Sequence, residues 1–102
     1  MLIYNTTYHT DLENARNFVI WINECYLPQV AENGILKNPR LAKILSHQEE
    51  DLSECFSLQF EVADTATLHL WHTLQGAKLN EELVHTFKDK VVGFPTLMDV
   101  II

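Results

Sequence analysis

The chain has 102 residues, the usual length of a single domain. Apolar residues make up 47% of it and glycine and proline number only three each, a composition that indicates one folded domain. Lysine and arginine total 7 against 14 aspartate and glutamate residues, which gives a formal charge of −7. Because this charge repels phosphate backbones and anionic lipids, and no run approaches the roughly 20 apolar residues of a membrane helix, we expect no nucleic-acid partner and no membrane partner.

The two cysteines, Cys25 and Cys55, lie far apart inside apolar stretches, and the first residues lack the pattern of a secretory signal. Two cysteines are too few for a disulfide framework in so short a chain. We therefore expect a cytoplasmic protein in which both thiols are reduced and buried.

The first strand is predicted over residues 2–10, which alternate between two faces and are rich in tyrosine, threonine and isoleucine. Asp11 follows as the N-cap of a helix predicted over residues 12–31, where apolar side chains recur every three or four positions. Pro28 interrupts this pattern, so we expect a kink at residues 24–27 or a new short helix that starts there.

The next two strands are predicted over residues 41–47, after a connection that Pro39 ends, and over residues 55–62, where the alternation is clearest. Residues 48–51 lie between them as an acidic stretch, which we expect to be a solvated loop.

A second helix is predicted over residues 65–87, with Asp64 or Thr65 as its cap. Gly76 lies in the middle of this helix, which indicates a break or a close packing contact at that position. The last strand is predicted over residues 91–102, where a proline indicates an edge strand or a bulge.

The order of these elements is β-α-β-β-α-β, which predicts a ferredoxin-like α+β fold in a single domain over residues 1–102. In this fold both helices cover one face of a four-stranded antiparallel sheet. The other face would carry apolar residues of the last strand beside a polar set on the first and third strands: Asn5, Thr7, His9, Ser57, Gln59 and Glu61. A mixed face this broad is best covered by a second copy, so we predict a homodimer through the uncovered sheet face.

Five segments resemble one family of short bacterial proteins of unknown function: I-Y-N-T-T-Y-H-T-D, W-I-N-E-C-Y-L-P-Q-V with the N-G after it, N-P-R-L-A-K-I-L, F-S-L-Q-F-E-V and F-K-D-K-V-V-G-F. The resemblance covers nearly the whole chain and implies the dimeric α/β-barrel group, which also holds antibiotic-biosynthesis-type monooxygenases and haem-degrading relatives. In many members a histidine precedes the proline-containing segment of the first helix. Here Tyr26 stands in that segment, so no histidine role is carried over.

The candidate ligand-binding residues are Asn5, His9, Tyr26, Gln59 and Glu61. Histidine is a general base or haem ligand in many sites, but for His9 we favour a histidine that is hydrogen-bonded inside a dimer interface. The polar set of Asn5, Gln59 and Glu61 is either a binding cluster or a network that fixes the dimer register. His69 and His72 lie one helical turn apart without a third ligand nearby, so we predict no metal site and no cofactor.

Three functions are compatible with these residues. The first is a homodimeric binding or interaction module. The second is a small cofactor-free monooxygenase- or isomerase-like enzyme, in which Tyr26, His9 and Asn5 orient an aromatic small molecule in a pocket between the helices and the sheet. The third is a haem-binding or haem-degrading protein. The enzyme functions follow from the resemblance in fold alone.

Overall fold

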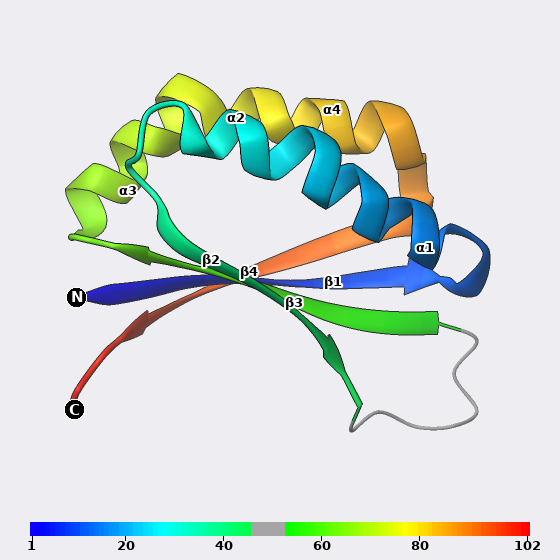
Figure 1. The fold of residues 1–102 in the computed structure, drawn as a ribbon, viewed down its shortest axis with the longest axis horizontal. Helices are drawn as coiled ribbons and strands as arrows, with labels where there is room; N and C mark the ends of the chain where they lie inside the picture. Colours follow the sequence, from blue (N-terminus) through cyan, green and yellow to red (C-terminus); the bar gives the residue numbers. More distant parts are fainter. Residues whose placement is uncertain (46–52) are drawn as a thin grey trace.

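The computed structural model describes residues 1–45 and 53–102. Its strands are β1 (Leu2–Asp11), β2 (Lys37–Ile44), β3 (Ser53–Val62) and β4 (Val91–Asp99). Its helical elements are α1 (Leu12–Trp21), η1 (Ile22–Tyr26), α2 (Leu27–Ala31), α3 (Thr65–Trp71), η2 (His72–Gly76), α4 (Ala77–Phe87) and η3 (Lys88–Lys90). The four strands form one antiparallel sheet in the order β2-β3-β1-β4, so the predicted ferredoxin-like α+β fold is confirmed (Figure 1).

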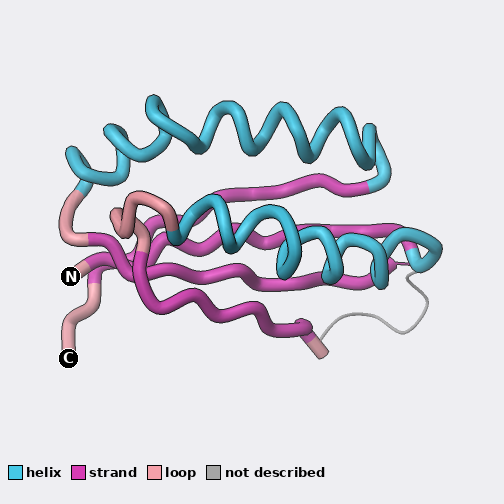
Figure 2. The backbone as a smooth tube through the Cα atoms, turned by 45° about the horizontal axis from the view of Figure 1, so that its top comes forward, coloured by secondary structure: helices cyan, strands magenta, loops and turns pink. Residues whose placement is uncertain are grey.

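Two continuous helical segments, α1-η1-α2 and α3-η2-α4, lie on the same side of the sheet (Figures 1 and 2). Between them and the sheet lies the hydrophobic core, built around side chains that are almost fully buried: Phe18, Ile22, Leu58, Trp71 and Leu79. The other side of the sheet carries no helix within the described part of the chain. The sheet is therefore buried on one face and open on the other.

Strand alternation sorts the residues of β1 between these two faces. Tyr8 and Thr10 are buried on the helix side, whereas His9 between them is exposed on the open side. The register pairs Tyr8 with Phe56 of β3 and with Gly93 of β4. Side chains directly opposite each other in a sheet lie on the same face. Phe56 therefore faces the helices together with Tyr8, and so does position 93.

Each helical segment contains a π-helical turn near its middle. In the first segment the π turn η1 immediately precedes α2, which carries Pro28 near its start. This is the interruption predicted at residues 24–27. In the second segment the π turn η2 ends at Gly76, the position predicted as a break. Asp64 is the N-cap of α3, since its Oδ1 accepts from the Thr67 N–H at 2.7 Å.

The predicted bounds of two strands need correction. β2 begins at Lys37 and passes through Pro39, because this edge strand shifts register between Lys37 and Arg40, with Asn38 in the left-handed region at φ 52°. β2 ends at Ile44, and the other residues predicted for its end, 46 and 47, lie outside the described residues, as does the predicted acidic loop at 48–51.

β4 ends at Asp99 rather than at residue 102, because its partner β1 begins at Leu2, which pairs with Asp99. A single further bond, from the Val100 N–H to the Met1 carbonyl, closes the pair at 3.1 Å. Pro95 lies within β4, which is the edge strand that this proline predicted. The prediction that both thiols are buried is confirmed for Cys55 and wrong for Cys25, which lies on the exposed side of η1.

Candidate functional site

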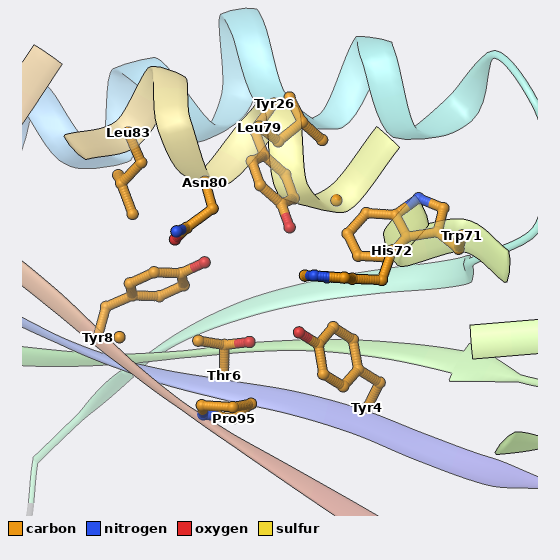
Figure 3. A pocket seen from close by; sticks show the side chains of 12 residues that line it. Tyr4, Thr6, Tyr8, Tyr26, Trp71, His72, Leu79, Asn80, Leu83 and Pro95 are labelled. Carbon is orange, nitrogen blue, oxygen red and sulfur yellow. The ribbon is translucent and has the colours of Figure 1, made fainter. Parts of the chain in front are cut away.

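A cavity of about 220 Å³ lies between the second helical segment and strands β1 and β4 (Figure 3). Its lining residues come from four parts of the chain: Tyr4, Thr6, Tyr8, Tyr26, Trp71, His72, Gly76, Leu79, Asn80, Leu83, Gly93 and Pro95. A mostly apolar hollow with a few converging polar groups is the usual form of a small-molecule site.

β1 supplies one wall of the cavity through three alternate residues, Tyr4, Thr6 and Tyr8. Because alternate residues of a strand face the same way, all three side chains point toward the helices. Tyr26 reaches toward them from η1, and the hydroxyl groups of the three tyrosines point into the same space (Figure 3). The cavity thus has a cluster of neutral hydrogen-bonding groups on one side.

Both π turns end at the cavity. Tyr26 is the last residue of η1, and His72 and Gly76 are the first and last residues of η2. A π turn inserts one extra residue into a helix and so turns the following side chains, and such turns occur frequently at functional sites. Here they direct Tyr26 from one helical segment and His72 from the other toward the same hollow.

Two glycines allow aromatic rings to lie against the backbone at the cavity wall. A Cβ atom at Gly76 would lie 2.6 Å from a ring carbon of Trp71, and a Cβ atom at Gly93 would lie 2.8 Å from Cε1 of Tyr8. Both distances are shorter than carbon atoms tolerate. The positions of the Trp71 and Tyr8 rings therefore depend on glycine at these two sites.

The hydroxyls of Tyr8 and Tyr26 remain protonated at neutral pH, because the pKa of each is raised. Burial raises the pKa of Tyr8 to about 12, Tyr4 adds to the shift, and hydrogen bonds with Thr6 and Tyr26 act in the opposite direction. Burial also raises the pKa of Tyr26 well above its ordinary value, with Tyr8 and Tyr4 adding to the effect. At neutral pH these groups act as hydrogen-bond donors and acceptors rather than as bases.

The described residues that line this cavity include no aspartate, glutamate, lysine or arginine. Trp71 is held in place by its indole N–H, which donates to Oε1 of Gln75 at 2.9 Å. The Gln75 amide in turn donates to the backbone carbonyl of Gln29 at 2.5 Å, which joins the two helical segments. The arrangement is suited to an uncharged ligand that stacks on aromatic rings and hydrogen-bonds with hydroxyl groups.

The five candidate residues do not meet in one place. Tyr26 lines the cavity, whereas Asn5 and His9 lie on the open face of the sheet, because they alternate with Thr6 and Tyr8 along β1. The expected grouping of Tyr26, His9 and Asn5 around one molecule is therefore corrected. The ligand-binding role of each residue stays a prediction.

On the open face His9 contacts two neighbours in the sheet. Its Nδ1 atom lies 3.2 Å from Sγ of Cys55 on β3, and its ring meets the edge of Phe94 on β4 with centroids 5.6 Å apart. Asn5 forms its own short network, in which Ser57 Oγ donates to Asn5 Oδ1 at 2.5 Å and Asn5 Nδ2 donates to Thr7 Oγ1 at 3.2 Å. Asn5 thus hydrogen-bonds with Ser57 and Thr7, and whether the polar set serves binding or the dimer register stays a prediction.

Gln59 and Glu61 line a shallow groove between β2 and β3. Glu61 accepts a hydrogen bond from Nδ2 of Asn38 at 2.9 Å, while Gln59 pairs in register with Asn5 on one side and Arg40 on the other. Gln59 is thus adjacent to the Asn5 network, but Glu61 belongs to the bulged edge of the sheet.

Metal ligands do not gather in the part of the chain that the structure describes: no three histidine, cysteine, aspartate or glutamate side chains come together there. His69 of α3 and His72 of η2 line a common hollow with Tyr4 and Pro95. Within residues 1–45 and 53–102, no helix is both long enough and apolar enough to cross a membrane.

Sequence reasoning placed Tyr4, Thr6 and Tyr8 on one face of the first strand but did not select them as site residues. The signal was available, because a core-facing strand side normally carries valine or isoleucine, and here it carries hydroxyl groups at successive positions. The sequence carries no comparable signal for Asn80 or for the position of His72 at the cavity. Both depend on how the second helical segment packs on the sheet.

Solved structures show this fold in two bacterial proteins. A proposed antibiotic biosynthesis monooxygenase from Deinococcus radiodurans is 13% identical, with a TM-score of 0.72 over 98% of this chain and 92% of that chain. An ethyl tert-butyl ether D (EthD) family protein from Bacillus halodurans C-125 is 12% identical, with a TM-score of 0.69 over 99% of this chain and 100% of that chain. Likeness at this identity shows the fold alone.

No curated protein matches the sequence. The family model described as "Domain of unknown function (DUF4286)" matches residues 1–101, which is nearly the full length given. The resemblance to a short family of unknown function is thereby confirmed. The chain belongs to the DUF4286 family, with a ferredoxin-like fold shared with antibiotic biosynthesis monooxygenase-type proteins.

Proposed function

We propose that this protein is a homodimeric binding module that holds a small uncharged molecule in the cavity between the second helical segment and the sheet. One observation carries the proposal: the hydroxyls of Tyr4, Tyr8 and Tyr26, which come from two distant elements, point into one hollow that both π turns border. Tyr8 hydrogen-bonds there with Thr6 and Tyr26, and because each hydroxyl is one donor and two acceptors, capacity remains for a ligand that occupies the hollow.

The dimer is supported by the apolar side chains of β4 on the open face. Val92, Phe94 and Met98 are 43%, 56% and 38% exposed, and they lie beside the hydrogen-bonded Asn5 network. The apolar side chains on this face lie beside polar side chains that already hydrogen-bond with one another. Burial of the face against a second sheet would therefore take water away from few polar groups that depend on it. The uncovered face thus supports packing between two copies.

Native mass spectrometry of freshly purified protein tests both parts of the proposal. We expect a mass of twice 11.8 kDa, with a co-purifying small molecule that is lost on denaturation. A Leu83→Trp variant, which fills the cavity, should retain the dimer but lose the small molecule. A monomeric wild-type protein would contradict the dimer, and unchanged retention by the Leu83→Trp variant would contradict the site.

A second candidate function is cofactor-free oxygenation of an activated aromatic compound in the same cavity. Its support is the aromatic wall of Trp71, Tyr4 and Tyr8 together with the hydroxyl donors, which can orient such a ring, and the shared fold with a proposed monooxygenase. Anthrone is a suitable probe, since O₂ oxidises its CH₂ to a carbonyl and releases water. O₂ uptake above the uncatalysed rate that disappears in Leu83→Trp supports this function, and uptake equal to the buffer rate contradicts it.

A further inference from the structure

A second hollow of about 310 Å³ adjoins the cavity described above. Tyr4, Trp71, His72 and Pro95 line both of them, so the two hollows share a wall rather than lying apart. The two rings in this shared wall, Tyr4 and Trp71, have centroids 6.1 Å apart at an angle of 60°. The second hollow is therefore the space next to the first cavity on the side of these two rings.

The two hollows differ in chemistry. The first contains the tyrosine hydroxyls and Thr6, whereas the second is completed by three residues of α3, namely Thr65, Leu68 and His69. Leu68 packs partly buried against the core and offers an aliphatic surface beside the Trp71 and Pro95 rings. Among the described residues that line the second hollow, none is aspartate, glutamate, lysine or arginine.

We infer that the ligand has two parts: an uncharged ring bearing a hydroxyl or carbonyl group, held in the tyrosine-lined cavity, and an aliphatic arm held against Leu68 in the second hollow. This inference rests on the proposed binding function and specifies the class of its ligand. Neither part carries a formal charge, because no aspartate, glutamate, lysine or arginine lines either hollow among the described residues. The shared aromatic wall clamps the junction between ring and arm.

The test compares phenol with 4-butylphenol by isothermal titration calorimetry on the wild-type dimer or monomer as purified. Each buried carbon of the arm strengthens binding by about fourfold, so a fully seated four-carbon arm makes 4-butylphenol bind roughly a few hundred times more tightly than phenol. Equal affinities for the two probes would overturn the two-part ligand while leaving the tyrosine-lined cavity intact. Absence of binding by both probes would overturn the binding function itself.

Substitutions separate the arm site from general hydrophobic attraction. Leu68→Ala is expected to weaken 4-butylphenol binding by about tenfold and leave phenol unchanged. Leu70→Ala is the matched control, because Leu70 lies on the same helix, is 51% exposed and lines neither hollow.

Because Leu68 also packs against the core, a second variant covers the case in which Leu68→Ala unfolds. Thr65 is exposed at the start of α3, and Thr65→Phe fills the second hollow from the surface. We expect this variant to lose the advantage of 4-butylphenol over phenol. A variant that weakens both probes equally would assign the residue a structural role and overturn the arm site.

Discussion

Gly93 lies opposite Tyr8 in the register of β1 and β4, and the Tyr8 ring covers the space that a side chain at position 93 would occupy. This contact places the Tyr8 hydroxyl at the cavity rather than over the sheet edge. Gly76 and Trp71 repeat the relationship on the helical side. The positions of two aromatic rings in the cavity wall, Tyr8 and Trp71, thus depend on glycine at positions 93 and 76.

Gly93→Ala should destabilise the protein by about 1–3 kcal/mol, because the added Cβ forces the Tyr8 ring away from its packed position. Urea denaturation measures the change in the free energy of unfolding. In a Tyr8→Leu background the same substitution should cost much less, because the ring is absent. An equal cost in both backgrounds would show that the clash with Tyr8 is not the cause.

Gln75→Ala should cost about 1–3 kcal/mol, because it leaves the buried Trp71 indole N–H without its acceptor and removes a hydrogen bond between the two helical segments. Thr73→Ala is the control, since Thr73 lies in the same π turn, is exposed and donates from Oγ1 to the His69 carbonyl of its own helical segment. We expect Thr73→Ala to be nearly neutral in thermal denaturation. Equal losses in the two variants would contradict the linking role of Gln75.

The Asp64 cap predicts a stability difference that depends on pH. Hydrogen bonds from Thr67 lower the pKa of Asp64 below its ordinary value of 3.8, so the charged cap stabilises the folded state above that pH. As the pH falls through the lowered pKa, this contribution is lost. The melting temperature of wild type should therefore exceed that of Asp64→Ala at pH 7, and the two should converge as the pH falls through the lowered pKa of Asp64. A constant difference across this range would contradict the charge-dependent cap.

Because the pKa of Tyr8 is raised, we expect the protein to lose stability at alkaline pH. Its pKa is raised from 10.0 to about 12, so above pH 10 the unfolded chain releases a proton that the folded protein retains. Stability should therefore fall between pH 10 and about 12, and Tyr8→Phe should reduce that fall when chemical denaturation is followed at each pH. Some loss remains in the variant, because the pKa of Tyr26 is raised as well. An identical decline in both proteins would exclude Tyr8 as its source.

The proposed dimer predicts that Phe94→Asp yields monomers, because a carboxylate on the open face would be buried without a partner in the interface. Size-exclusion chromatography with light scattering measures the mass directly. Leu74→Asp is the matched control: Leu74 is 61% exposed on the helical side and should leave the mass unchanged. A dimer that survives Phe94→Asp would place the interface elsewhere.

Much of the fold could be predicted because its signals are local. The hydroxyl-rich alternation of β1, the Asp64 cap and the positions of both helix interruptions each depend on neighbours a few residues away. The bounds of β2 were missed for the opposite reason. Pro39 normally ends a strand, and only the bulge between Lys37 and Arg40 at a sheet edge makes it acceptable.

The sequence by itself determined the order of elements, the fold class and the division of β1 into two faces, because period and turn chemistry are properties of short segments. Only the tertiary structure decided which residues share a site. Tyr26 and Tyr8 are 18 positions apart and meet because the π turn η1 directs one of them toward the strand that carries the other. His9 and Tyr8 are neighbours in sequence yet lie on opposite faces of the sheet, since strand geometry separates adjacent side chains while packing brings distant ones together.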